Sequence, residues 1–357
     1  MSTRSYALWN NKGGVGKSTI TFHLATRYAE RHPDTRVLVI DLCPQANSSM
    51  MLLGGGENGE KITFAISQAS ATPKTVAGYI AEVLTRGEGG ATPDPASFVT
   101  RCADHNARVP GNIDLLCGDG NLEPMAPLIS QRALQEALTE GSSPWKWVHQ
   151  IMRGFINSVE SLESPVVVFI DTNPSFSVYT EIAITAADEL LVPINADDAS
   201  RVATNAMFSL IYGANPPHPI YGKYTYAARA DTHGLPKPLV KLVIGNRLTQ
   251  YDGAAGAFGA MSDATADSLF AAFTANPSRF SKGVENAGIS ATADFREKYS
   301  VLLRDFNTAG VVAAHQGSPI SQLVGGKYRV YNRDITVKAD RLEECLEAVD
   351  EVVNALG

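Results

Sequence analysis

Short runs of apolar and β-branched residues recur along the chain, and most are followed by segments with a helical pattern. Continuous apolar runs of this length are typical of strands that helices cover on both faces, as in a parallel sheet. The pattern therefore predicts an α/β fold with a mostly parallel, twisted sheet and helices on both faces. The expected core strands are Tyr6–Trp9, Val37–Ile40, Ile113–Leu116, Val166–Ile170, Leu190–Ile194 and Leu239–Ile244, with a further strand near Gly310–Ala314.

Apolar residues at helical spacing mark two helices that are expected to pack on this sheet. Ile20, Leu24 and Tyr28 recur four residues apart, so they share one face of a helix. A longer stripe runs through the C-terminal segment, at Leu342, Cys345, Leu346, Val349, Val353 and Leu356. Both segments are predicted to be amphipathic helices.

The pattern is weaker between about Met50 and Arg108, where the chain is rich in Gly, Ala, Thr and Pro. This stretch contains Gly54-Gly55-Gly56 and Gly87–Pro95, with helical patches such as Val76–Thr85 between loops. The chain shows no internal repeat and no long biased linker that would require a second domain. We therefore expect a single domain over residues 1–357, with an insertion at about residues 50–108.

Composition places the chain among soluble globular proteins, because 44% of its 357 residues are hydrophobic and 19% are charged. No apolar run approaches the roughly 18 residues that span a bilayer. The cysteines are far apart and form no CxxC pair, so neither a disulfide framework nor a zinc or iron–sulfur site is indicated. A reducing cytoplasm, with no membrane partner, is the expected location.

A glycine-rich segment with a lysine and two hydroxyl residues lies between the first predicted strand and the first predicted helix. It matches the phosphate-binding loop G-x-x-x-x-G-K-[ST], or P-loop, except that Asn11 stands at the first glycine position. In such loops backbone N–H groups surround the phosphates of a nucleotide. Lys17 is expected to reach the β- and γ-phosphates of ATP, Ser18 to bind Mg²⁺, and Thr19 to lie near the α-phosphate. The remaining residues of the predicted phosphate cradle are Gly13, Gly14, Val15 and Gly16.

Two aspartates, Asp41 and Asp171, each follow an apolar strand. Because the carboxyl ends of parallel strands share one edge of the sheet, both carboxylates can meet the P-loop there and hold Mg²⁺ through water. The alternative for either residue alone is a helix-capping or turn aspartate.

The loop and five later segments resemble the ParA/MinD family of partition and positioning ATPases. Lys12 beside Gly13-Gly14 is similar to the signature lysine of the deviant Walker A motif of that family. The resemblance covers about residues 5–50 and 110–355 and is poor across the insertion. The other similar segments are Val37–Gln45, Val168–Ser175, Leu191–Ile194 with Val243–Arg247, and Gly317–Ile320.

The resemblance implies roles for individual residues. Lys12 is expected to cross into a second subunit and touch its nucleotide, so that ATP binding assembles a sandwich dimer; the alternative is a solvated surface lysine. Lys12, Lys17 and Asp41 would thus serve ATP hydrolysis. Asn246 could hydrogen-bond the adenine, or it could turn the chain after a strand.

Cys43 departs from the family pattern, in which a second aspartate orients or activates the attacking water. A neutral, buried thiol replaces it poorly, so slow hydrolysis is expected, while ATP binding is not affected. Asp197 or Asp198 could substitute, but surface solvation or capping of a helix before Ala199 is the expected role of both.

Family members often hold DNA non-specifically as ATP dimers and release it when an adaptor of the ParB kind stimulates hydrolysis. The formal charge of −7 excludes a protein that is basic all over, but a local basic face is compatible with it. The candidate face is Lys327, Arg329 and Arg333, with Lys338, extended by Arg296, Lys298 and Arg304. An ordinary strand with solvated charges is the alternative.

The sequence therefore predicts a nucleoid-associated ATPase for DNA segregation or cargo positioning. A MinD-like regulator at the membrane surface competes with it, but the last predicted helix carries an acidic side that anionic lipid would repel. Its acidic residues are Glu343, Glu344, Glu347, Asp350 and Glu351. A small-molecule kinase or ligase is the other alternative, because the insertion could build a substrate pocket.

Overall fold

The computed structural model describes residues 3–69, 71–137, 139–160, 166–195, 197–214, 219–246, 255–281 and 286–357. Arg247, part of one segment that resembles the family, lies outside these residues. The described strands form an eight-stranded sheet in the order β3-β4-β2-β5-β1-β6-β7-β8 and a separate hairpin, β9–β10. The strands of the large sheet are β1 (Arg4–Leu8), β2 (Arg36–Leu42), β3 (Thr100–Arg101), β4 (Ile113–Leu116), β5 (Val166–Thr172), β6 (Glu189–Ile194), β7 (Leu239–Gly245) and β8 (Ser300–Leu302), and those of the hairpin are β9 (Gly326–Val330) and β10 (Arg333–Val337).

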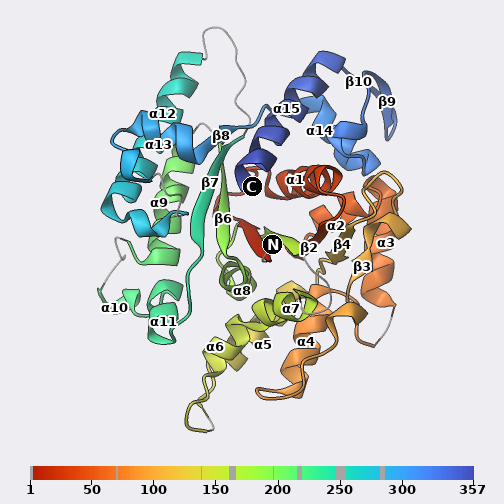
Figure 1. Cartoon of the computed structure of the whole chain (residues 1–357). Coiled ribbons are helices and arrows are strands. Elements are labelled where there is room, and N and C mark those ends of the chain that lie inside the picture. Colours follow the sequence, from red (N-terminus) through yellow and green to blue (C-terminus); the bar gives the residue numbers. More distant parts are fainter. Residues whose placement is uncertain are drawn as a thin grey trace.

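Helices cover both faces of the sheet (Figure 1). None of them, in the part of the chain that the structure describes, is long and apolar enough to cross a membrane. The helices are α1 (Lys17–Arg31), α2 (Asn47–Leu52), α3 (Gly56–Gln68), α4 (Val76–Arg86), α5 (Leu122–Ala133), α6 (Pro144–His149), α7 (Ile151–Glu160), α8 (Val178–Ala186), α9 (Asp198–Tyr212), α10 (Pro219–Gly222), α11 (Tyr226–Thr232), α12 (Ala255–Ala275), α13 (Thr292–Tyr299), α14 (Asn307–Gln316) and α15 (Ala339–Leu356).

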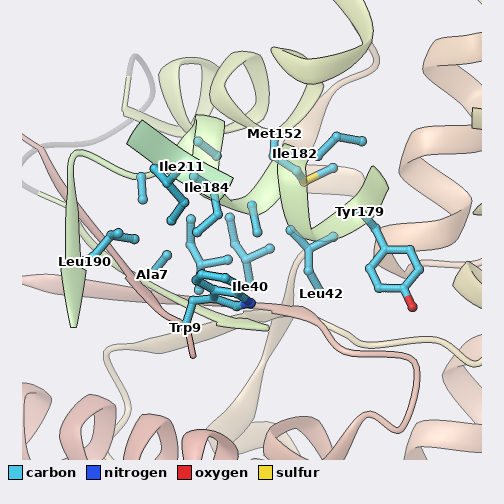
Figure 2. Packing of buried hydrophobic residues seen from close by; sticks show 14 of the residues in the cluster. Ala7, Trp9, Ile40, Leu42, Met152, Tyr179, Ile182, Ile184, Leu190 and Ile211 are labelled. Atoms are coloured by element: carbon cyan, nitrogen blue, oxygen red, sulfur yellow. The ribbon is translucent and has the colours of Figure 1, made fainter. Parts of the chain in front are cut away.

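Alternation along the strands divides the buried side chains into two layers. Ala7 and Trp9 join the layer beneath α4 to α8, whereas Tyr6 and Leu8 join the layer beneath α1, α2, α14 and α15. Figure 2 shows the first layer, with Trp9, which directly follows β1, and Ile40 of β2 packed against Ile182 of α8. The predicted α/β class is confirmed: every pairing in the large sheet is parallel except that of β3 with β4.

The topology places β1 between β5 and β6, with β2 on the far side of β5. In the register of these strands, Leu8 of β1 and Asp41 of β2 both lie opposite Asp171 of β5. The carboxyl ends of the three strands therefore meet where the chain leaves β1 for the P-loop.

One predicted strand is wrong. Gly310–Ala314 belongs to helix α14, and the eighth strand is β8, at Ser300–Leu302. The apolar run suggested a strand, but Ala309, Val312 and Ala313 recur at the spacing of one helical face, and that face is buried in the same core layer as residues of α1 and α2. Burial of this face favours the helix over the β-branched preference of two adjacent valines.

The glycine-rich segment after α2 makes a tight backbone contact with the C-terminal part of the chain. Gly55 has φ +70°, and a Cβ atom there would lie 2.2 Å from the backbone N of Gly317. Gly317 is the residue that ends α14, with φ +57°. Only glycine permits this approach at both positions, and it fixes the start of α3 against the end of α14. The insertion itself stays a prediction; its residues supply α3, α4 and edge strand β3.

His23 of α1 is a buried histidine with no hydrogen-bond partner for either ring nitrogen among the described residues. Its ring lies 5.0 Å from the ring of Phe22 and 4.7 Å from that of Phe306. Burial lowers its pKa from 6.5 to about 3, because an imidazolium there would lose its hydration.

We expect His23→Phe to make the protein less sensitive to acid. Above pH 6.5 the imidazole is neutral in both states; below it the unfolded chain binds a proton that the folded protein does not. The free energy of unfolding should therefore fall by about 1.4 kcal/mol per pH unit until the pH nears the folded pKa, and the variant should lack this dependence. Urea unfolding between pH 7 and 4 measures it, with exposed His105→Gln as the control. Equal pH slopes in wild type and His23→Phe would contradict it.

Candidate nucleotide-binding site

The P-loop leaves the end of β1 and enters α1 at Lys17. Gly14 and Gly16 have φ +74° and +85°, values that side-chain-bearing residues rarely adopt. A Cβ atom at Gly16 would lie 2.4 Å from Nδ2 of Asn246, so this glycine also leaves room for a neighbouring strand end. The local geometry is that of a loop whose amides surround an anion at a helix N-terminus.

Lys17 lies across the mouth of this loop. Its Nζ donates to the carbonyl oxygens of Asn10 and Lys12, each at 3.0 Å, and the residue is only 6% exposed. Burial lowers the pKa of Lys17 to about 8. An anion bound in the loop would restore the preference for the charged ammonium, because it supplies the opposite charge that water no longer screens.

Asp41 and Asp171 are both fully buried and lie side by side at the ends of β2 and β5. Asp41 Oδ2 accepts from the backbone N of Ser49 at 3.0 Å and from its Oγ at 2.7 Å. Oδ1 of the same carboxylate accepts from the backbone N of Cys43 at 3.1 Å. Asp41 is therefore held in place by the segment that follows its own strand.

Asp171 keeps one carboxylate oxygen without a partner. Its Oδ1 accepts from the backbone N of Thr172 at 3.0 Å, but Oδ2 is buried with no hydrogen bond among the described residues. Burial and the charge of Asp41 raise the pKa of Asp171 to about 7, and nearby Ser18 and Lys17 oppose the shift. Ser48 Oγ is a second buried oxygen without a partner in the part of the chain described above.

These oxygens fit a divalent cation. Mg²⁺ prefers carboxylate, hydroxyl and water oxygens, and a cation beside Asp171 would remove both the repulsion by Asp41 and the unpaired buried oxygen. Ser18, Asp41 and Asp171 would hold it, and its chemistry would be neutralisation of charge on the phosphates.

Cys43 lies at the wall of the same site, only 5% exposed. Burial and the neighbouring carboxylates of Asp41 and Asp171 raise the pKa of its thiol to about 12. The thiol is therefore neutral at physiological pH and cannot accept a proton from water there.

Lys12 is engaged within its own protomer. Its ammonium forms an ion pair with Asp197, and the two side chains are 21% and 40% exposed. Asp197 also caps α9, because its Oδ1 accepts from the backbone N of Ser200 at 2.8 Å. Burial alone would raise the pKa of Asp197, but hydrogen bonds from Lys12 and Ser200 outweigh it, so the pKa is lowered. Asp197 is thus a helix-capping residue, which is one of the roles that the sequence analysis expected for it.

Asn246 follows β7 and contacts the P-loop directly. Its Nδ2 donates to the carbonyl oxygen of Val15 at 2.9 Å, and its backbone N donates to that of Ile194 at 2.7 Å. Asn246 therefore links the P-loop to the ends of β6 and β7 through these two hydrogen bonds. An adenine contact by Asn246 stays a prediction.

A cavity of about 740 Å³ opens beside the P-loop. Its wall is formed by the P-loop, by residues that end or follow β2 and β5, by α2, α3 and α14, and by the turn of the β9–β10 hairpin. The lining residues are Gly13, Gly14, Gly16, Lys17, Ser18, Thr19, Cys43, Gln45, Asn47, Met50, Met51, Gly56, Glu60, Thr172, Asn173, Pro174, Ala314 and Tyr331.

The basic residues near the C-terminus lie on the β9–β10 hairpin. Lys327 and Arg329 alternate onto one face of it, whereas Arg333 pairs with Val330 on the other. Arg329 forms an ion pair with Asp334 at 3.3 Å, with both side chains 63% exposed. Of the predicted extension, Arg296 and Lys298 lie on α13, on the opposite side of the molecule from the hairpin (Figure 1).

Sequence reasoning missed several site residues. Ser48 and Ser49 are a polar pair shortly after Asp41, a signal that could have indicated them as its partners. No sequence pattern indicated Glu60 or Tyr331 as site residues, because they line the cavity only as a result of how α3 and the hairpin pack in the folded protein.

Comparisons with known proteins give one family and a set of similar folds. Residues 3–212, more than half of the chain, match the family described as the AAA domain. None of the curated proteins matches the sequence.

Several solved structures share the fold. Apo McdA from Cyanothece is 17% identical, with a TM-score of 0.57, over 99% of this chain and 100% of that one. A Cyanothece McdA variant in complex with ATP is 16% identical, with a TM-score of 0.58, over 99% of this chain and 98% of that one. A protein classed with plasmid partition from Borrelia burgdorferi, bound to AMPPNP, is 15% identical, with a TM-score of 0.51, over 100% of both chains.

Proposed function

The chain belongs to the AAA domain family of P-loop ATPases, and from this premise we propose that it is an ATP-dimerising ATPase that segregates DNA or positions a cargo. The P-loop geometry carries the proposal: Lys17 lies across the loop, and Lys12 lies beside it as a second cation. The ATP complex of McdA and the AMPPNP complex of the Borrelia protein support ATP as the nucleotide.

The proposed cycle assigns the site residues as follows. Lys17, Ser18 and Thr19 bind the phosphates with the loop amides, while Ser18, Asp41 and Asp171 hold Mg²⁺. Lys12 leaves Asp197 and contacts the nucleotide of a second subunit, which makes the dimer depend on ATP. Because Cys43 stays protonated, hydrolysis by the dimer alone is slow, and an adaptor of the ParB kind stimulates it.

The β9–β10 hairpin supports the DNA-binding part of the proposal. It forms a small sheet apart from the large one, and Lys327, Arg329 and Arg333 are all exposed on it. Exposed cations on this hairpin can neutralise phosphates of DNA of any sequence, and such binding would associate the protein with the nucleoid.

ATP-loaded protein is expected to bind duplex DNA of unrelated sequences with similar affinity, and the affinity should fall steeply with salt. Replacing Arg329 and Arg333 by glutamine should weaken binding and reduce the slope of log K against log[salt] by about 2, because each arginine neutralises about one phosphate. Fluorescence anisotropy with ATP, ADP or no nucleotide measures both effects.

The matched control is Arg86→Gln. This arginine is also solvent-accessible and paired with an acid, Glu82, but it lies on α4, away from the hairpin (Figure 1). DNA binding that does not depend on nucleotide would contradict the ATP-switched function. Binding that responds equally to the control and to the hairpin variants would contradict the assigned surface.

A further inference from the structure

A second cavity, of about 420 Å³, shares no lining residue with the nucleotide cavity. Its wall is formed by α4 and the loop that follows it, which belong to the predicted insertion, and by α6, α7 and the residues just before α6. Figure 1 shows these helices away from the β9–β10 hairpin, with α4 in orange. We call this cavity the insertion pocket; the lining residues that matter here are Tyr79, Val83, Arg86, Lys146, Trp147 and Ile151.

The loop after α4 is fixed in place by its own contacts. Gly87, with φ +79°, ends α4 and turns the chain back. The carboxylate of Glu88 then ties the loop to the segment before α6, because Oε2 accepts from Ser142 Oγ at 2.7 Å and Oε1 from the backbone N of Ser143 at 3.1 Å. Glu88 is the one acid among the described residues that line the pocket, and both of its oxygens already have donors.

Tyr79 lines the pocket with a hydroxyl that has no hydrogen-bond partner within the described part of the chain. The residue is 1% exposed, and its ring is held at 5.2 Å from that of Phe98 and 4.8 Å from that of Phe155. Burial raises the pKa of the hydroxyl to about 12, so it keeps its proton and stays a donor. Buried donors without a partner are rare in native proteins and point to a ligand.

Lys146 is the second donor of the pocket that lacks a partner. It is half-buried on α6, and its ammonium makes no hydrogen bond or ion pair with any described residue. Arg86, the other lining cation, forms an ion pair with Glu82. Between these polar groups, Val83, Trp147 and Ile151 supply an apolar wall. The pocket thus combines an unpaired positive charge, a phenol donor and apolar surface.

We propose that the insertion pocket binds a small organic acid, with its acidic group on Lys146 and Tyr79 and its apolar body against the wall at Trp147. The volume lies within the roughly 300–1,000 Å³ of pockets that hold small organic ligands. An anion gains most here, because charge-assisted hydrogen bonds are the strong ones and a half-buried ammonium is poorly screened by water. Since no lining residue is shared with the nucleotide cavity, the inference does not depend on the proposed function.

Two fluorescent probes of nearly the same shape separate the acidic group from the apolar body. Anilinonaphthalene sulfonate carries one acidic group, and phenylnaphthylamine is the same molecule without it. Wild type should bind both saturably, and a saturating amount of AMPPNP should displace neither. Lys146→Met keeps the apolar stem and removes the charge, so it should weaken binding of the sulfonate roughly tenfold and leave that of phenylnaphthylamine within about twofold.

Tyr79→Phe keeps the ring between Phe98 and Phe155 and removes only the hydroxyl. It should weaken binding of the sulfonate several-fold and leave that of phenylnaphthylamine unchanged. The matched control is Lys241→Met, because this lysine is also half-buried but lies on β7 and does not line the pocket. It should change neither affinity. Titration of probe emission with the full chain measures all of these affinities.

A wild type that binds the sulfonate without saturation would overturn the inference, and so would a sulfonate affinity that Lys146→Met leaves unchanged. Equal losses for both probes in that variant would also overturn it, because they would show altered packing of the pocket and not a lost charge contact. Displacement of the sulfonate by AMPPNP would place the probe in the nucleotide cavity and exclude the insertion pocket as its site. In each case ATP binding by the wild type tests the proposed function separately.

Discussion

Cys43→Asp is expected to accelerate single-turnover hydrolysis of ATP about 10²- to 10⁴-fold, the usual contribution of a residue that positions or activates water. The thiol of Cys43 lines the cavity beside Asp41 and Asp171, and its pKa of about 12 keeps it neutral. A carboxylate at this position can accept a hydrogen bond from the attacking water, which the thiol does poorly. Rapid-quench measurement of the first turnover, at saturating ATP and Mg²⁺, gives the rate.

Cys43→Asn is the matched control, because it has nearly the same shape as aspartate and no charge. We expect it to hydrolyse ATP at about the wild-type rate, and ATP affinity should be nearly unchanged in both variants. A wild type that hydrolyses ATP rapidly, with no gain in Cys43→Asp, would show that another residue or a partner positions the water.

Lys12→Ala is expected to abolish ATP-induced dimerisation while sparing much of the ATP affinity. Lys17 serves the phosphates of its own subunit, whereas the proposed contact of Lys12 with the opposite nucleotide exists only in the dimer. Removal of a buried charge pair at each of two symmetric sites should weaken the dimer at least about 100-fold. Light scattering with a non-hydrolysable ATP analogue measures the effect.

A variant at the ion pair of Lys12 with Asp197 is expected to have the opposite effect and to favour dimerisation. Asp197→Asn keeps an acceptor for the backbone N of Ser200, so the cap of α9 survives, but it removes the charge that holds Lys12 within its protomer. Because a partly exposed pair contributes about 0.2–1 kcal/mol and dimerisation breaks one such pair in each protomer, this variant should dimerise at up to about 30-fold lower concentration. Dimers of unchanged stability in Lys12→Ala would rule out the cross-subunit role.

Several features of this protein were determined by local sequence alone. The glycines of the P-loop permit left-handed backbone at Gly14 and Gly16, and the preceding apolar run forms β1, so loop, strand and helix follow from a short stretch of chain. Asp41 and Asp171 could be placed together because parallel strands align their carboxyl ends. The family match and the fold confirm the predicted P-loop ATPase of the ParA/MinD type.

Other features were decided only by tertiary structure. Gly310–Ala314 is helical because burial of Val312 in the core favours a helix there. The local preference of its two valines would favour a strand. The ion pair between Lys12 and Asp197 forms only after distant elements have packed together. The same holds for the position of Tyr331 at the wall of the nucleotide cavity. A sequence pattern reports which residues share a face of one element. Which elements then face each other depends on close packing between segments far apart in the chain, as in the contact of Gly55 with Gly317, and no local periodicity encodes that contact.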